Sequence, residues 1–283
     1  MIYFLTDKKI PNYKDSTIPY TYNSDTRNLE LLETCYPFWI LHNAGIKDIK
    51  LITNYNIPSA GDTVIFYNSS SNNIKLNEQY KNIQIVTDTP LIEGCDGYVC
   101  YDPSIICRDV KHRWFHVMYP MPIDLKRCTP RWPPKIISCI SPKSITLDSN
   151  IKKSKYRIVT DSWSNGGDED IMFHIRQQIT YIPSKGLKSR MRFPSHKTPN
   201  RLYQSWYCNV PGIFSSSTSM DWIRKSDLDF LEANSLDELN ECVNRLMNDK
   251  GLYNSMIENC RTRQDENTHE EIALQWQLVF DTV

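Results

Sequence analysis

Hydrophobic and polar positions along the first half of the chain follow two different patterns, one typical of strands and one typical of helices. Short runs rich in β-branched and aromatic side chains, each bounded by turn residues, predict strands. These runs occupy residues 2–5, 49–53, 62–68, 82–88, 97–102 and 114–120. Residues 28–44 instead carry apolar side chains at helical spacing up to Gly45, and Pro37 would kink or split such a helix.

The same alternation returns in the second half, after a proline-rich passage. Residues 120–155 begin with a stretch that holds six prolines, which interrupt regular elements, and continue as a polar and basic segment. Beyond them, strands are predicted at residues 156–161, 171–176, 211–215 and 229–233, and helices at 200–209, 235–249, 251–263 and 268–280. Strands that alternate with helices are typical of α/β domains with a largely parallel sheet. We therefore expect two such domains, joined by the passage.

Two of the predicted helices begin with a capping box. Ser235 is followed three residues later by Glu238, and Thr268 by Glu271. In this pattern the hydroxyl and the carboxylate satisfy backbone N–H groups at the start of the helix. The pattern indicates that helices begin next to Ser235 and Thr268.

The composition narrows the class of protein. The 283 residues include 33 basic and 33 acidic side chains, so the net charge is zero, which argues against a strongly basic nucleic-acid-binding surface. No apolar stretch is long enough to cross a bilayer, and the start, MIYFLTDKK, lacks the features of a signal peptide. We therefore expect a soluble, cytoplasmic protein without a transmembrane segment and without nucleic acid as a partner.

The nine cysteines do not have the spacing of a metal site. Cys95 and Cys100 are separated by four residues, and neither a second pair nor a His-x-x-x-His sequence accompanies them. The acidic group at residues 168–170 follows two glycines and suits a loop equally well. The sequence therefore predicts free thiols and no bound metal.

Paired cations stand at the start of the predicted helix at residues 200–209. Lys197 precedes Pro199, and Asn200 and Arg201 begin the helix. The start of a helix offers unpaired N–H groups and a positive dipole end, which together suit a phosphate, and cations there are unfavourable without an anion. Lys197 and Arg201 could therefore converge on one diphosphate. The alternative is that both are solvated surface charges.

A family resemblance rests on this segment and on the residues after it. The sequence HKTPNRLYQSWYCNVPGIFS, continued by SMDWIRKSDLDFLEA, resembles the C-terminal half of nucleotide-sugar glycosyltransferases of the GT-B type. SNGGDEDIMFHIRQ, TVIFYN and IVTDTP are similar to strands of the same family, and the likeness is clearest over residues 156–263. In size and composition the chain is also similar to compact virus-encoded members of this family, such as the β-xylosyltransferases of large algal (chlorella) viruses.

The resemblance implies two Rossmann-like domains that face a central cleft. Residues 1–150 would bind the acceptor, residues 151–265 the nucleotide sugar, and residues 266–283 would form a helix that crosses back to the first domain. The implied activity is transfer of a sugar from a nucleotide diphosphate sugar to a hydroxyl of a glycan or glycoprotein. A UDP-sugar is favoured, with UDP-xylose as one candidate. The reaction would need neither metal nor cofactor and would invert configuration.

The resemblance also implies roles for single residues of the donor site. Lys197 and Arg201, next to Asn200, would contact the diphosphate. Ser217 and Ser219 belong to a serine run at residues 215–219 whose backbone N–H groups would face the phosphates or the sugar. Asp221 falls where many relatives have a carboxylate, more often the longer Glu, that hydrogen bonds to the ribose. The alternative for Asp221 is an acid that favours the start of a helix.

An inverting transfer needs a base that takes the proton of the acceptor hydroxyl. Open α/β sheets bind their ligands at the carboxyl ends of the strands, and Asp88 lies at the carboxyl end of a predicted strand of the first domain. Asp7 follows the first strand in the same way, and Asp25 precedes the first helix, where it could instead be a cap. Asp88 and Asp25 are therefore the candidate bases, with Asp7 as a third. A retaining transfer would require none of them.

Two other functions remain open at this point. The first is a catalytically inactive GT-B-like module that binds a glycan or a nucleotide. The second is a different nucleotide enzyme on a doubly wound fold, which the absence of G-x-G-x-x-G and G-x-x-x-x-G-K-(S/T) from the sequence argues against.

Overall fold

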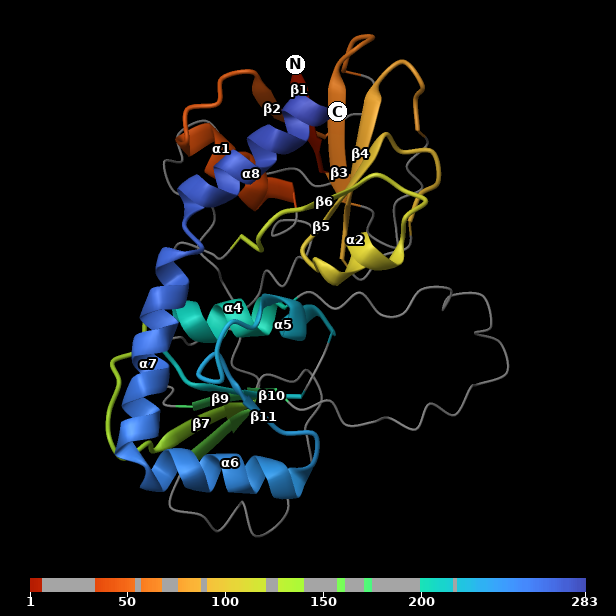
Figure 1. Cartoon of the computed structure of the whole chain (residues 1–283). Coiled ribbons are helices and arrows are strands. Elements are labelled where there is room, and N and C mark those ends of the chain that lie inside the picture. Colours follow the sequence, from red (N-terminus) through yellow and green to blue (C-terminus); the bar gives the residue numbers. More distant parts are fainter. Residues whose placement is uncertain are drawn as a thin grey trace. The chain divides into compact units, whose positions relative to one another are not determined.

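The computed structural model divides the chain into two compact units (Figure 1). It describes residues 1–6, 34–53, 57–67, 76–87, 91–120, 127–139, 157–160, 171–174, 199–215 and 218–283. The described residues of the first unit fall within Met1–Pro122 and Asn267–Val283. Those of the second unit fall within Ile123–Lys188 and Pro199–Glu266.

The first unit is built on a parallel sheet of six strands in the order β2-β1-β3-β4-β5-β6. The strands are β1 (Ile2–Leu5), β2 (Ile49–Ile52), β3 (Thr63–Tyr67), β4 (Lys81–Val86), β5 (Gly97–Cys100) and β6 (Trp114–His116). Each falls within, or one residue before, an apolar run that predicts a strand. The inner strands are almost entirely buried, as expected for a parallel sheet that is covered on both faces.

Helices α1 (Tyr36–Asn43) and α8 (His269–Thr282) contact each other on one side of this sheet (Figure 1). The ring of Phe4 in β1 lies edge-on to Phe38 of α1, with 5.9 Å between ring centroids, and to Trp276 of α8, with 5.7 Å. The Trp276 side chain is fully buried. The last helix is therefore part of the core of the first unit.

Pro37 lies in the first turn of α1 and does not interrupt the described helix. A proline is tolerated there because the N–H groups of the first turn have no partner within the helix. The expected kink is wrong for residues 36–43, and residues 28–33 lie outside the described residues.

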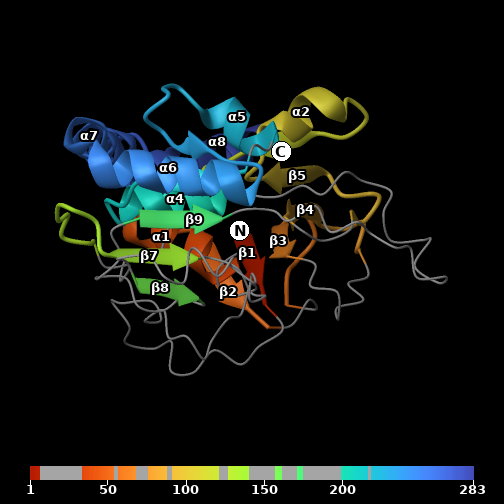
Figure 2. The ribbon, with the colours of Figure 1, turned by 90° about the horizontal axis from the view of Figure 1, so that it is seen from below.

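The second unit has a parallel sheet of five strands in the order β11-β10-β9-β7-β8. Of these, β9, β7 and β8 are labelled side by side in Figure 2. The strands are β7 (Ile136–Cys139), β8 (Arg157–Thr160), β9 (Ile171–His174), β10 (Gly212–Phe214) and β11 (Leu231–Glu232). β7 lies inside the stretch that the sequence predicts as a passage between domains, so the second unit begins well before residue 150. The prolines at 133 and 134 precede the β-branched pair Ile136–Ile137 and leave this strand uninterrupted.

The helices of this unit are α4 (Asn200–Tyr207), α5 (Thr218–Ile223), α6 (Leu236–Asn248) and α7 (Lys250–Asp265). Ser235 begins α6 as predicted: its hydroxyl accepts from the backbone N–H of Glu238 at 3.2 Å. The Glu238 carboxylate accepts from the backbone N–H of Asn234 at 2.6 Å. Thr268 caps α8 in the first unit in the same way, with the N–H of Glu271 at 3.2 Å. Both predicted helix starts are confirmed.

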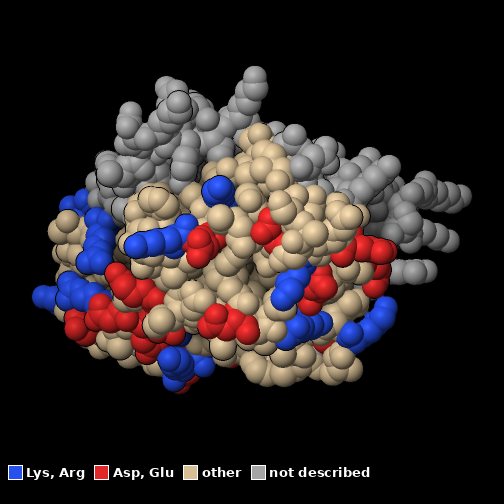
Figure 3. Space-filling view, turned by 90° about the horizontal axis from the view of Figure 1, so that it is seen from above, with Lys and Arg blue, Asp and Glu red and all other residues tan. Residues whose placement is uncertain are grey.

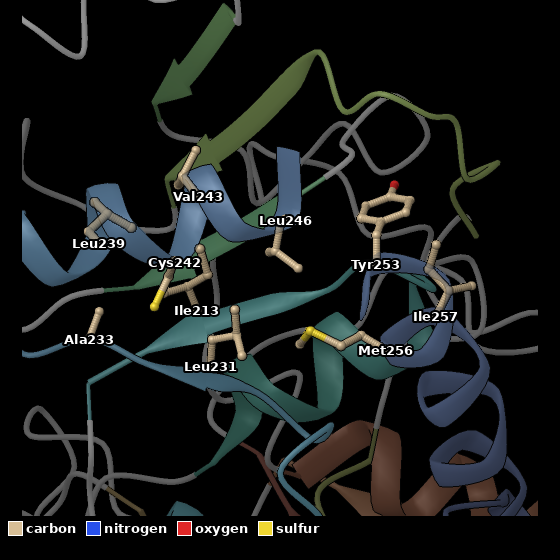
Figure 4. Packing of buried hydrophobic residues seen from close by; sticks show 10 residues of the cluster. All are labelled: Ile213, Leu231, Ala233, Leu239, Cys242, Val243, Leu246, Tyr253, Met256 and Ile257. Carbon is tan, nitrogen blue, oxygen red and sulfur yellow. The ribbon is translucent and has the colours of Figure 1, made fainter. Parts of the chain in front are cut away.

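Figure 4 shows how α6 and α7 cover the second sheet. Apolar side chains at helical spacing on α6 meet Ile213 of β10 and Leu231 of β11. The buried cluster consists of Ile213, Leu231, Ala233, Leu239, Cys242, Val243, Leu246, Tyr253, Met256 and Ile257. This core fixes β10 and β11, whose carboxyl ends carry part of the candidate site.

No helix in the described part of the chain is long and apolar enough to span a membrane.

Candidate functional site

The candidate donor site lies at the carboxyl edge of the second sheet. All pairings in this sheet are parallel, so its strands end at one edge, which is where open α/β sheets bind ligands. Residues 208–211 join the end of α4 to the beginning of β10, so the start of α4 is directed toward that edge. α5 follows the end of β10 by four residues. The fold therefore brings the starts of α4 and α5 to the same edge.

The start of α4 carries two of the predicted donor-binding residues. The helix begins at Asn200, directly after Pro199, whose carbonyl accepts from the N–H groups of Leu202 (2.9 Å) and Tyr203 (3.2 Å). Arg201 is half-buried in the first turn, and its guanidinium lies 3.4 Å from the amide oxygen of the buried Gln204. The first turn of α4 contains no acidic side chain. Lys197 lies outside the described residues.

The segment after β10 differs from the loop that the serine run predicts. α5 already begins at Thr218, so Ser219 lies in a helix and is buried, while Asp221 is exposed in its first turn. The hydroxyl of Ser215 donates to the carbonyl of Ala233 at 3.1 Å and ties the end of β10 to the end of β11. Ser217 lies outside the described residues. The physical reason for the difference is that Met220 and Ile223 give the segment an apolar side that packs as a helix.

The carboxyl edge of the first sheet collects a second group of polar residues. Thr87 directly follows β4, and its hydroxyl lies 3.4 Å from the hydroxyl of Tyr67 at the end of β3. Asp88 is the next residue, outside the described part of the chain, as are Asp7 and Asp25. The structure therefore places the residue before Asp88 at the edge where a base is expected.

Two further titratable residues at this edge were missed in the sequence. Asp102 follows β5 and is buried; its carboxylate accepts from the N–H (3.0 Å) and the hydroxyl (2.5 Å) of Ser104. Ser104 begins α2 (Ser104–Arg108). His116 ends β6, and burial holds its pKa below the ordinary value although the Asp102 carboxylate acts in the opposite sense. Its buried Nε2 has no hydrogen-bond partner among the described residues. A neutral imidazole at this place is able to accept a proton.

The signal that points to Asp88, a polar residue at the end of a predicted strand, would have found Asp102 but not His116. Asp102 ends the predicted strand at residues 97–102, whereas His116 lies within the predicted strand at residues 114–120. Their proximity follows from the register, because Cys100 pairs with His116 across β5 and β6.

The cysteine side chains that the structure describes are free thiols, as predicted. Burial raises the pKa of both Cys100 and Cys260 to about 12, so these two thiols stay protonated and unreactive. No group of three or more His, Cys, Asp or Glu side chains suited to a metal ion occurs within the described residues. The acidic group at residues 168–170 lies outside them.

No known protein-family model matches the sequence, and no curated protein is similar to it. Solved structures are similar in fold. The DNA-modifying β-glucosyltransferase, solved with and without uridine diphosphoglucose, matches with a TM-score of 0.56 and 11% identity over 98% of this chain and 97% of its own. S. aureus TarM in complex with fondaparinux, alpha-GlcNAc-glycerol and UDP matches with a TM-score of 0.51 and 8% identity over 86% of this chain.

The fraction of each neighbour's length that this chain covers differs among the neighbours. It spans 58% of the TarM chain and 55% of a chain of the Gap123 complex from Streptococcus agalactiae. The β-glucosyltransferase and TarM are GT-B glycosyltransferases. At such low identity the similarity establishes the fold alone, which is the parallel α/β architecture of the GT-B glycosyltransferases.

Proposed function

We propose that the chain is a glycosyltransferase that moves a sugar from a nucleotide diphosphate sugar to a hydroxyl group of a glycan or glycoprotein. The observation that carries the proposal is the place of Asn200 and Arg201. They begin a helix at the carboxyl edge of a parallel sheet. The start of a helix and a guanidinium are both suited to phosphate oxygens. The fold, which matches a β-glucosyltransferase over nearly the whole chain, supports the same function.

On the donor side, the diphosphate is bound by Lys197, Arg201 and the N–H groups at the start of α4. Cations placed there stabilise the charge that develops on the departing diphosphate, so the reaction proceeds without a metal or a cofactor. Ser217 and Ser219 lie near the phosphates or the sugar, and Asp221 binds the ribose. A uridine nucleotide is the donor, since two structural neighbours were solved with UDP or uridine diphosphoglucose. UDP-glucose and UDP-xylose are the first donors to compare.

On the acceptor side, Asp88 is the base of an inverting transfer, with Asp25 as the second candidate. The place of Thr87 at the carboxyl edge of the first sheet supports Asp88. Asp7 stays the third candidate, and His116 at the same edge is a further group with a suitable protonation state.

The acceptor is a glycan. Lys and Arg side chains lie among Asp and Glu side chains on the face shown in Figure 3, which differs from the basic surface typical of nucleic-acid-binding proteins. One structural neighbour is nevertheless a DNA-modifying enzyme. A glycan array and duplex DNA, offered with the same radiolabelled UDP-sugar, separate the two acceptor classes: label in DNA alone contradicts the proposal.

The donor site is tested by removing its cations. In the variant Lys197→Ala/Arg201→Ala, binding of UDP, measured by calorimetry, is expected to weaken about 100-fold or more, because each charged hydrogen bond contributes roughly 1.5–3 kcal/mol. The control is Lys225→Ala/Arg261→Ala, which removes two exposed cations of the same unit that pair with Glu266 and Glu258. Equal UDP affinity in the wild type and in both variants would reject the assignment.

The base is tested by Asp88→Asn. Donor binding is expected to be unchanged, while transfer to an acceptor falls on the order of 100- to 10,000-fold because proton removal is lost. Asp48→Asn, at an exposed position before β2, is the control. Normal turnover by Asp88→Asn moves the role to Asp25, Asp7 or His116. If the wild-type chain binds UDP and glycans but transfers no sugar, the alternative function, an inactive binding module, is favoured.

A further inference from the structure

The second unit contains a buried ion pair, between Asp229, which follows α5, and Arg263 of α7. The Asp229 side chain is 0% exposed and the Arg263 side chain 6%, and the Arg263 Nε lies 3.1 Å from Asp229 Oδ1. Burying two charges is costly unless their remaining hydrogen-bonding groups also find partners. The partners of this pair therefore show what it holds in place.

Arg263, in α7, contacts two other helices and the residue that follows the end of α7. Its Nη2 donates at 2.8 Å to the carbonyl of Ile223, the last residue of α5. Its guanidinium lies over the ring of Trp206 in α4, 4.3 Å from the ring centroid. Its Nη1 hydrogen bonds to Glu266, beyond the last turn of α7. One side chain thus joins α4, α5 and α7.

Asp229 fixes the segment that leaves α5. Its Oδ2 accepts from the backbone N–H groups of Lys225 (2.7 Å) and Ser226 (3.0 Å). Its Oδ1 also accepts from the side-chain amide of Asn259 in α7 at 2.9 Å. The carbonyl of Asp229 accepts from the indole N–H of Trp206 at 3.1 Å. The turn after α5 is therefore bound on both sides, to α7 and to α4.

α5 depends on such contacts. A helix of six residues is too short to be stable without tertiary packing, and its last carbonyls have no partner within the helix. A cation at that end satisfies a carbonyl and matches the negative end of the helix dipole. Arg263 supplies this cation from a buried position, so it fixes where α5 ends.

We propose that Arg263 and Asp229 are positioning residues for the donor. They hold α5, with Ser219 and Asp221, in a fixed place relative to α4, with Asn200 and Arg201. The groups at the starts of the two helices then keep the spacing that a nucleotide sugar requires. This inference rests on the proposed function, because it gives the ion pair a role in binding the same donor.

The experiment uses the full chain with Arg263→Lys, which keeps the charge and loses the planar guanidinium. Arg261→Met is the matched control: it lies two residues away on α7, is exposed and pairs with Glu258 at 2.8 Å. Affinity for UDP-glucose and UDP is measured by calorimetry well below the unfolding temperature of each variant. Hydrogen exchange compares residues 218–229 with α6.

In Arg263→Lys, we expect faster exchange confined to residues 218–229 and binding of UDP-glucose about tenfold weaker or more, since small displacements of positioning groups are costly. Arg261→Met should change neither. A second variant, Asp229→Asn/Arg263→Gln, replaces both charges with amides and leaves no charge buried alone, so it serves if Arg263→Lys does not fold. It is expected to show the same two effects.

Two results would overturn the inference, and they differ. If residues 218–229 exchange faster while UDP-glucose binds as in the wild type, the ion pair is purely structural and the proposed function stands. If the wild-type chain binds neither UDP nor UDP-glucose, the proposed function fails, and the positioning role with it.

Discussion

At the scale of single residues, the protonation of His112 is coupled to two neighbouring carboxylates. Its Nδ1 lies 2.7 Å from Asp109 Oδ2, and its Nε2 lies 3.2 Å from Glu93 Oε2. The hydrogen bond with Asp109, and a second with Glu93, raise the pKa of His112 although burial opposes the shift. The contact with His112 in turn lowers the pKa of Glu93. The protonated imidazole therefore joins the loop before β5 to the loop before β6.

The direction of the pH dependence follows from the raised pKa. A pKa that is higher in the folded state contributes stability that is complete below the ordinary value of about 6.5 and is lost as the pH rises through the folded pKa. From pH 6 to pH 8 the unfolding temperature of the wild type should therefore fall more than that of His112→Asn. The corresponding difference in the free energy of unfolding is on the order of 1 kcal/mol or less, as for other ion pairs near the surface. Parallel pH profiles of the two proteins would contradict this assignment.

The residues of the candidate site were predictable where chemistry and position coincide in one short stretch. Arg201 and Asn200 stand at a helix start that proline and the apolar spacing both mark, and the structure places them there. Asp102 ends a predicted strand and could have been found by its position, but its proximity to His116 depends on the pairing of β5 with β6, and no local pattern encodes that pairing. The donor-binding roles of Lys197, Asn200, Arg201, Ser217, Ser219 and Asp221 and the catalytic roles of Asp88 and Asp25 all stay predictions.

At the scale of elements, the sequence predicted the helices and strands whose hydrophobic pattern is long or clearly periodic. Each predicted strand of the first sheet exists, and so do α6, α7 and α8. The short helix α2 was missed, and a helix at α5 was only the alternative given for Asp221, since one or two turns show too little periodicity. β7 was hidden by its proline neighbours. The strand order was also beyond local patterns, because it is set by pairings between segments far apart in the chain, such as β7 with β9.

β10 offers a test of how tightly the second sheet is packed. A Cβ atom at Gly212 would collide with the ring of Phe214, which is fully buried and lies 6.0 Å from the ring of Phe230. Gly212→Ala should therefore lower the free energy of unfolding by about 1–3 kcal/mol, the usual cost of overpacking a core. Urea unfolding measures this change.

Phe214→Leu provides the matching control for that collision. The smaller side chain makes room for a methyl group, so Gly212→Ala should cost less in the Phe214→Leu background than in the wild type. Equal costs in the two backgrounds would show that the strain arises elsewhere.

At the scale of the whole molecule, the first unit is assembled from both ends of the chain. Residues Asn267–Val283 belong to it together with Met1–Pro122. The Lys81 ammonium donates to the carbonyl of Val283 at 2.7 Å, and the Arg113 guanidinium hydrogen bonds to the carbonyl of Thr282. The end of α8 is thereby bound to the first residue of β4 and to the residue before β6.

The contribution of α8 to this unit is measurable. Trp276→Ala should destabilise the first unit by about 3–5 kcal/mol, because it leaves a cavity beside Phe4. Leu274→Ala, whose side chain is 65% exposed on the same helix, should change stability by about 0.5 kcal/mol or less. The stability of the two variants is compared by thermal unfolding. Similar losses of stability in both would mean that α8 does not complete the core.

The discontinuity of the first unit has a consequence for synthesis. Domains fold as units while the chain leaves the ribosome, beginning with those whose residues have all emerged. The second unit is complete once Glu266 has emerged, whereas β1 and α1 lack Trp276 until α8 follows. The unit that starts first is thus expected to fold last, with the apolar side of its sheet in need of protection until the final helix arrives.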